Sequence, residues 1–110
     1  MKTNIYVIWD AAAQVYNKPF YLHNDAVAIR SATDILRAGD TDISNSPQDF
    51  TMFRIGTYDD GDAQIDLMAK FVTVVKFHEL AATLRTEQVT QHSIHDFSEA
   101  AKAEREEKQA

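Results

Sequence analysis

The stretch PQDFTMFRIGTYDDGDAQIDLM, residues 47–68, decides the fold because it predicts a β-hairpin together with its register. Two segments of alternating apolar and polar residues flank a turn that is rich in aspartate, which is typical of an antiparallel strand pair. A three-residue loop at 59–61 gathers the apolar residues on one face, and Gly61 is expected to supply its left-handed residue. The expected pairs are Phe53 with Leu67, Ile55 with Ile65 and Thr57 with Ala63, with Arg54 against Asp66 on the other face.

The remainder of the chain predicts further strands and two helices around this hairpin. Strands are expected at 5–9, 20–22 and 71–75, and helices at 25–38 and about 77–85. Residues 5–9 are apolar on both sides, as in a central strand, and Asn24 and Gly39 provide a cap and a stop for the first helix. The polar residues 40–49 indicate a surface loop. The predicted fold class is therefore α+β, a small antiparallel sheet with one or two packed helices and a C-terminal helix.

The C-terminal segment differs in composition from the rest. Residues 1–92 are expected to form a single α+β domain, and 93–110 a charged helix or tail that begins with the capping pattern Ser93-x-x-Asp96. Its apolar stripe is thin, so this helix must dock on the domain, pair with another copy or fray. We expect a homodimer, with oligomerisation residues Ile94, Phe97 and Ala101.

Composition narrows the classes of function. The chain has 110 residues, 45% of them hydrophobic, which suits one modest core. It has no apolar run long enough to span a bilayer, and residues 1–10 lack the core of a signal peptide, so a cytosolic protein without a membrane partner is expected. The absence of cysteine excludes disulfides and thiolate sites. A net charge of -6 argues against coating nucleic acid by charge alone.

Catalytic and metal-binding patterns are weak. His92 and His95 are three residues apart and can share a helical face, but a metal site also needs a third ligand and an oriented second shell, for which Asp96 beside His95 is thin support. The aspartates around Gly61 are typical of a turn and lack the distal glutamate of a helix–loop–helix calcium site. The chain has only three glycines and no nucleophile motif. We therefore expect no enzyme, no cofactor and no metal, and a small metal-dependent enzyme using the histidines is the weakest of three hypotheses.

Nucleic-acid binding is the chemistry that the residues support best. The outer hairpin face is expected to present Arg54 and Tyr58, and a neighbouring first strand adds the ring of Tyr6, so that bases can stack and phosphate can be contacted. The structural alternative is that Arg54 pairs with Asp66 and that Tyr58 covers Gly56. The basic residues expected to extend the patch are Lys70 and Lys76, with Arg30 and Arg37 as further candidates.

The order of these pieces resembles a known family. The segments are IYVIWDAAAQVYNKPFYLHNDAVAIRSATDIL, SPQDFTMFRIGTYDDGDAQIDLM and KFVTVV, over roughly residues 4–76. Together they resemble the small nonstructural protein of gokushovirus-type microviruses (Microviridae), the counterpart of the C protein of phiX-type phages. The most characteristic block is Pro47, Asp49, Phe50, Phe53, Gly56, Tyr58, Asp59 and Asp60.

The resemblance implies a viral nonstructural protein of the host bacterial cytoplasm. Such a protein binds viral DNA, single-stranded or in the replicative form, associates with the replication complex, and promotes the switch to single-stranded genome synthesis and packaging into procapsids. The alternative is a protein–protein adaptor that binds the replication initiator or a procapsid protein without contacting DNA. The family supplies no catalytic motif to transfer.

Overall fold

The computed structural model of the chain describes residues 1–87. The predicted oligomerisation residues Ile94, Phe97 and Ala101, and the histidine pair His92 and His95, therefore lie outside the described residues, as does the expected domain boundary at 92/93. Within residues 1–87 the chain forms an antiparallel sheet with helices packed against it, which confirms the α+β class.

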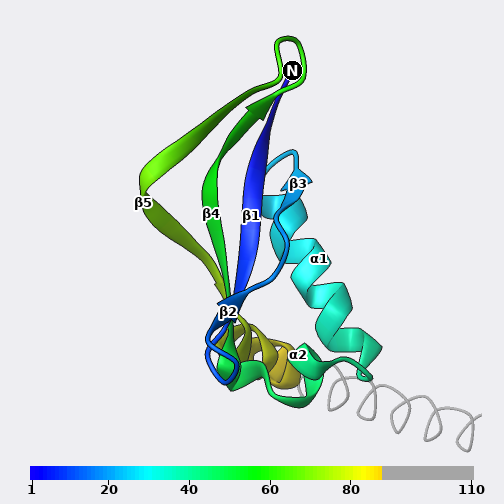
Figure 1. Cartoon of the computed structure of the whole chain (residues 1–110). Coiled ribbons are helices and arrows are strands. Elements are labelled where there is room, and N and C mark those ends of the chain that lie inside the picture. Colours follow the sequence, from blue (N-terminus) through cyan, green and yellow to red (C-terminus); the bar gives the residue numbers. More distant parts are fainter. Residues whose placement is uncertain (88–110) are drawn as a thin grey trace, which may run out of the picture.

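Over residues 1–87 the sheet has five strands and is antiparallel throughout (Figure 1). They are β1 (Lys2–Asp10), β2 (Val15–Tyr16), β3 (Phe20–Leu22), β4 (Phe50–Asp59) and β5 (Gln64–Lys76). Their order is β2-β1-β4-β5, and β3 also pairs with β1. Because β4 occupies one edge of β1, β2 and β3 share the other edge, β2 near the end of β1 and β3 nearer its start.

β1 is the central strand, as its sequence predicts, and it is apolar on both faces. Ile5, Tyr6, Val7 and Ile8 are all buried. Since side chains alternate along a strand, Tyr6 and Ile8 project to the side covered by helices, which we call the helix face, and Ile5 and Val7 project to the opposite side, which we call the open face.

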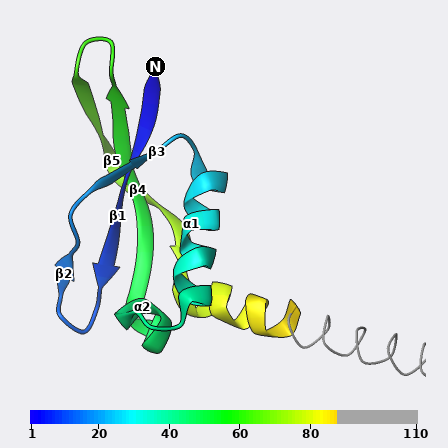
Figure 2. The same ribbon diagram turned by 90° about the vertical axis from the view of Figure 1, so that its right-hand side faces the viewer.

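Helix α1 (Asp25–Ala38) has the predicted bounds. The side chain of Asn24 accepts a hydrogen bond of 2.9 Å from the backbone N–H of Val27, and Gly39 ends the helix in a left-handed conformation with φ 76°. Ala28 and Ala32 are fully buried, and their small side chains allow close packing. Figure 2 shows α1 lying along one side of the sheet.

The segment 40–49 is not the plain loop that its polarity indicates. It contains the short helix α2 (Asp42–Asn45) and a 3₁₀ turn, η1 (Pro47–Asp49). Thr41 and Ser44 cap α2 reciprocally, each side chain bonding to the other residue's backbone N–H. Serine takes the place of the usual glutamate in this capping box, which explains why the sequence pattern is easily missed.

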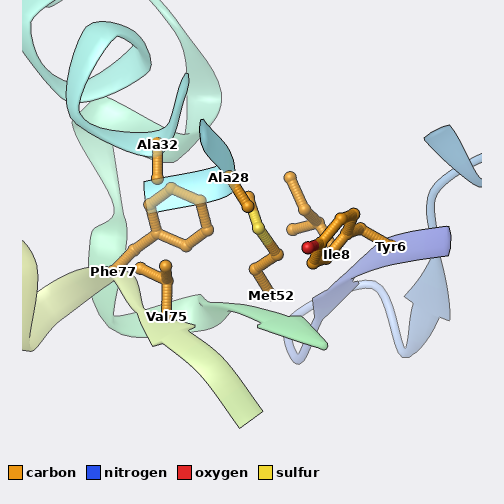
Figure 3. Packing of buried hydrophobic residues seen from close by; sticks show 7 residues of the cluster. All are labelled: Tyr6, Ile8, Ala28, Ala32, Met52, Val75 and Phe77. Carbon is orange, nitrogen blue, oxygen red and sulfur yellow. The ribbon is translucent and has the colours of Figure 1, made fainter. Parts of the chain in front are cut away.

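The core lies between the helices and the half of the sheet formed by the end of β1, the start of β4 and the end of β5. Residues 77–87 are helical, in agreement with the prediction, and Phe77 at the start of that helix is fully buried. Figure 3 shows Met52 at the centre, with Val75 and Phe77 on one side of it and Tyr6 and Ile8 on the other. The partly buried hydrophobic residues around this core are Phe20, Leu22, Leu36, Ile43, Phe50, Val74 and Leu80.

The predicted hairpin exists, but its predicted register is wrong. The observed pairs near the turn are Gly56 with Leu67, Thr57 with Asp66, Tyr58 with Ile65 and Asp59 with Gln64. The loop therefore spans the four residues 60–63, and Ala63, with φ 60°, takes the left-handed conformation expected of Gly61. Ile65 and Leu67 are not core residues, since they are 53% and 68% exposed. The reason is that this end of the hairpin extends beyond the helices of residues 1–87, so none of them covers it and selects the apolar pairing (Figure 1).

β5 bows away from β4 in its middle (Figure 1). Leu67 pairs with Gly56 and Val72 pairs with Arg54, so residues 68–71 have no cross-strand partner on β4. Nevertheless the segment stays extended, and the face alternation from Leu67 to Val72 remains in step.

At Gly56 the backbones of β4 and β5 approach each other closely. A Cβ atom at this position would lie 2.2 Å from the carbonyl oxygen of Asp66, which is far inside van der Waals contact. Glycine is required here by the approach of two backbones.

Candidate nucleic-acid interface

The strand registers assign each predicted site residue to one face of the sheet. Cross-strand partners project to the same side, so the odd-numbered residues of β1 and their partners make up the open face. By this rule the open face comprises Thr3, Ile5, Val7, Trp9, Tyr16, Tyr21, Thr51, Phe53, Gly56, Tyr58, Ile65, Leu67, Thr73 and Lys76.

A β-bulge separates Arg54 from Tyr58. Tyr6 pairs with Arg54 while Ile5 pairs with Gly56, so Ile55 is an extra residue in β4. In a regular strand, residues 54 and 58 would share a face. The extra residue places Arg54 on the helix face and Tyr58 on the open face, so the expected joint surface of these two side chains is wrong.

Tyr6 is a core residue, which corrects the expectation of an exposed ring. Its side chain is fully buried and stacks on Phe20, with ring centroids 5.9 Å apart. The hydroxyl donates to Asp25 at 2.7 Å and accepts from the Asn4 amide at 3.0 Å. Burial raises the pKa of Tyr6 to about 12, and the Asp25 carboxylate adds to the rise. Tyr6 therefore positions α1 on the sheet and offers no surface to a base.

Arg54 pairs with Asp25 and not with Asp66. Its Nε lies 3.5 Å from the Asp25 carboxylate, and this nitrogen is buried without a hydrogen-bond partner. The predicted partner Asp66 lies opposite Thr57. Because the Arg54 side chain is only 30% exposed and faces the helix side, it is poorly placed to meet a ligand on the open face.

The four candidate lysines and arginines do not form one patch. Lys76 is exposed and lies in the row that runs across the open face through Thr51 to Trp9. Lys70 is exposed in the bowed part of β5, where the alternation assigns it to the helix face. Arg30 and Arg37 belong to α1 and so lie on the helix side of the sheet.

The open face instead carries a cluster of aromatic rings. Trp9 and Tyr16 have ring centroids 4.7 Å apart, and Tyr16 also meets Phe53 at 6.4 Å and Phe71 at 6.5 Å. Tyr16 is 49% exposed and Phe71 is 43% exposed, so both rings present area to solvent. We call these four residues, Trp9, Tyr16, Phe53 and Phe71, the aromatic cluster.

A second pair of rings lies further along the same face. Tyr21 of β3 pairs with Ile5 of β1, Tyr58 of β4 pairs with Thr3, and the centroids of the two rings are 5.5 Å apart. Tyr21 is 50% exposed. The open face therefore has two groups of rings in line along β1. Within residues 1–87, the helical residues that reach the core all lie on the opposite side.

Sequence reasoning did not find the aromatic cluster because it did not find β2. Val15 and Tyr16 form a two-residue strand that pairs with Asp10 and Trp9. The turn leading to it is held by the Asp10 carboxylate, which accepts from the backbone N–H groups of Ala12 and Ala13, and Gln14 is left-handed with φ 57°. An aspartate followed by small residues and then Val-Tyr was the available indication of this turn.

The acidic hairpin turn is distant from the aromatic cluster. The Met1 ammonium contacts Asp59 and Asp60, and the backbone N–H of Gly61 holds the pKa of Asp59 below its ordinary value. These aspartates thus serve the turn, as predicted. Lys2, which pairs with Asp59, is seven residues from Trp9, roughly 23 Å along the strand. This exceeds the screening length of about 8–10 Å at physiological salt, so the turn weakly affects an anion at the cluster.

The remaining parts of the described surface offer no stronger candidate for a binding site. A cleft of about 770 Å³ lies among α1, α2 and the helix at 77–87, and its charged lining residues Arg37, Arg85 and Glu87 are exposed. In the described part of the chain, no three His, Asp or Glu side chains come together as metal ligands would. His23 and His78 are both exposed and stand on separate elements.

The protein is thus a small α+β protein whose antiparallel sheet bears helices on one side and exposed aromatic rings on the other. The chain belongs to the phage ORF5 protein family, whose family model matches residues 3–80. No curated protein and no solved structure matched the chain. Among the described residues, no helix has the length and apolar character needed to cross a membrane.

Proposed function

We propose that this phage protein binds single-stranded viral DNA on the open face of its sheet. The observation that carries the proposal is the aromatic cluster, in which Tyr16 touches three other rings and is half-exposed itself. Aromatic rings on a sheet surface are a common platform for unpaired bases, and each stacked base contributes about 1–3 kcal/mol as measured by alanine substitution.

The composition of the open face favours single strands over duplex. Stacking requires a free base face, which a duplex buries between neighbouring base pairs. By register the face carries one lysine, Lys76, among several rings. Stacking rather than phosphate neutralisation then supplies most of the affinity, which is compatible with a net charge of -6.

The biological role follows from the resemblance to the nonstructural proteins of gokushovirus-type microviruses. We propose that the protein acts in the host bacterial cytoplasm, without catalysis or a cofactor, and associates with the replication complex. By holding newly displaced single strands it promotes the switch to single-stranded genome synthesis and packaging into procapsids. The viral replication initiator and procapsid proteins are its expected protein partners.

Trp9 provides a direct test because it is the single tryptophan of the chain and belongs to the aromatic cluster. Titration with oligothymidylate of about 20 nucleotides at low and moderate salt is expected to quench its fluorescence, and a duplex of equal length is expected to quench it much less. Fluorescence anisotropy of labelled DNA supplies an independent binding curve. Absence of binding to single strands at low salt would exclude the proposal.

The second candidate function is an adaptor that binds a replication or capsid protein without contacting DNA. The observation in its favour is that rings outnumber cations on the open face, a composition that is also typical of the core of a protein–protein interface. The same titration separates the two, since an adaptor leaves Trp9 fluorescence unchanged when DNA is added.

A further inference from the structure

We propose that a second copy of this chain docks on the outer edge of β5, antiparallel to it, with Met68 facing the partner's Met68. The two copies are related by a two-fold axis through this point and extend one sheet into the other. The interaction needs no DNA and is independent of the proposed function.

The first observation is an unpaired edge. β5 is the last strand of the sheet, and in the described part of the chain only β4 lies beside it. Residues 68–71 lack a partner even on β4. Backbone N–H and C=O groups in an extended strand form hydrogen bonds wherever a partner is available, and a long uncovered edge is a template for another strand. Figure 1 shows this part of β5 bowed outward, away from the helices.

The second observation is the apolar character of the same edge. Ile65, Leu67 and Phe71 are 53%, 68% and 43% exposed. Soluble proteins usually protect such edges with charge, proline or a covering segment. The only charges between residues 64 and 72 are Asp66 and Lys70, one of each sign.

The third observation selects a second copy as the occupant. Residues 64–72, QIDLMAKFV, are complementary to themselves when paired antiparallel about Met68. In that register Asp66 faces the partner's Lys70, and Ile65 faces the partner's Phe71. By symmetry each contact occurs twice. Moving the register by two residues in either direction separates the charges.

Asp66 and Lys70 cannot form this pair within one copy. They are four residues apart on an extended strand, roughly 13 Å. Among residues 1–87 neither takes part in an ion pair, and the Asp66 carboxylate accepts only the Gln64 side-chain amide, at 3.1 Å. Both side chains lie on the helix face of β5, so a cross-copy pair brings them to the same side.

This geometry joins the two open faces. Because the axis is perpendicular to the sheet, the aromatic cluster of each copy lies on the same side of the extended sheet. If the proposed DNA binding holds, the dimer offers one strand two clusters, and the second site increases affinity by raising the effective concentration. This consequence alone rests on the proposed function.

The test is a charge swap read by sedimentation equilibrium of the full chain. Asp66→Lys and Lys70→Asp each place like charges opposite each other at two symmetric positions, and each is expected to raise the dimer dissociation constant by about tenfold or more. An equimolar mixture of the two variants restores both pairs between unlike copies. It is therefore expected to dimerise about as tightly as the parent chain.

The matched controls are Asp34→Lys and Lys18→Asp, which change the same charges at exposed positions away from β5. These are expected to leave the dimer unchanged, and far-ultraviolet circular dichroism verifies that all variants are folded. The proposal is overturned by a parent chain that is monomeric at every concentration, or by a dimer that both β5 variants leave intact. It is equally overturned if the mixture fails to recover. DNA titration of the variants reports separately on the proposed function.

Discussion

The hydroxyl of Tyr6 donates a hydrogen bond of 2.7 Å to the carboxylate of Asp25, so the central strand is fastened to the first turn of α1. Arg54 approaches the same carboxylate from β4, with Nε at 3.5 Å. One acidic side chain therefore joins a helix to two strands. This explains why two of the residues expected to bind DNA serve the fold.

Replacing Tyr6 with phenylalanine removes this bond while keeping the ring in the core. We expect the lost hydrogen bond to lower the free energy of unfolding by about 1–2 kcal/mol at neutral pH. The loss is no larger because Asp25 is partly exposed and can hydrogen-bond to water instead. Urea unfolding followed by Trp9 fluorescence measures the loss. Tyr21→Phe removes the hydroxyl from a half-exposed ring and is expected to change the free energy of unfolding little.

The same substitution changes the dependence of stability on pH. Burial raises the pKa of Tyr6 to about 12, above its ordinary value of about 10. The native state therefore holds this proton more tightly than the unfolded state, so the stabilisation is complete below pH ~10 and is lost as the pH rises toward 12. The parent chain should lose stability relative to Tyr6→Phe over that interval. Parallel pH profiles for the two proteins would contradict the assignment.

Gly56→Ala is expected to destabilise the protein by about 2 kcal/mol or more, because the new methyl group meets the backbone of β5 at Asp66. Gly61→Ala is the matched control. Its added Cβ lies 3.3 Å from the Asp59 side chain, which can move, and the expected change is below about 0.5 kcal/mol. Thermal unfolding of both variants compares them, and equal losses would show that β4 and β5 do not approach at Gly56.

Ala63→Gly is expected to stabilise the hairpin by about 0.5–1 kcal/mol. Ala63 has φ 60°, a conformation that costs an alanine roughly 1–2 kcal/mol, and glycine removes most of this strain. The greater freedom of glycine in the unfolded chain offsets part of this gain. Ala13→Gly, at a turn position without a positive φ, should give no gain. Chemical denaturation of the two variants tests the four-residue loop, since the three-residue loop predicted from sequence would place no strain at Ala63.

Tyr16→Ala and Phe71→Ala are each expected to weaken binding of single-stranded DNA by about five- to a hundredfold, the equivalent of one lost stacking contact. Ile29→Ala removes an exposed apolar side chain from α1, and binding should be unchanged. Anisotropy titrations at fixed salt provide the comparison, with circular dichroism to verify folding. Unchanged affinity in both ring variants would place the DNA site elsewhere.

The salt dependence of DNA binding distinguishes a cation on the open face from one on the helix side. Lys76 shares the open face with the aromatic cluster, so Lys76→Ala should reduce the slope of log binding constant against log salt by about 0.7. Arg30 is exposed on α1, on the helix side of the sheet, and Arg30→Ala should leave the slope unchanged. Titrations at several salt concentrations measure both slopes, and the opposite ranking would reverse the assignment of faces.

Features that depend on neighbouring residues were predictable from sequence. The bounds of α1 follow from Asn24, which caps a backbone group three residues away, and from Gly39, whose positive φ ends the helix. The central position of β1 follows from its apolar residues on both faces. Each of these depends on chemistry within one element, so the linear order of residues is sufficient.

The hairpin register and the assignment of faces were not predictable in the same way. The sequence favours Ile65 and Leu67 as core residues, but the helices of residues 1–87 do not reach that end of the sheet, and both side chains are exposed. The bulge at Ile55 depends on how β4 fits β1, and it reverses which face Arg54 occupies relative to Tyr58. A shift of one residue in a strand moves a side chain to the other side, so small irregularities decide the composition of a face.

The residues of the candidate site were also only partly predictable from the sequence. Tyr58 and Lys76 were named from sequence and do lie on the open face, whereas Tyr6, Arg54 and Lys70 were named and lie on the other. The aromatic cluster was not foreseen, since it joins rings from β1, β2, β4 and β5 around Tyr16.

The sequence by itself determined the α+β class, the bounds of α1, the central strand and the presence of the aspartates at a hairpin turn, because short-range hydrogen bonding and hydrophobic alternation dictate them. Only the tertiary structure decided that Asp25 holds Tyr6 and Arg54 inside, and that Trp9, Tyr16, Phe53 and Phe71 meet outside. The physical reason is that a sheet face is assembled from strands distant in sequence. The register of the strands depends on bulges and on how far the helices extend over the sheet, and the sequence of a single strand determines neither.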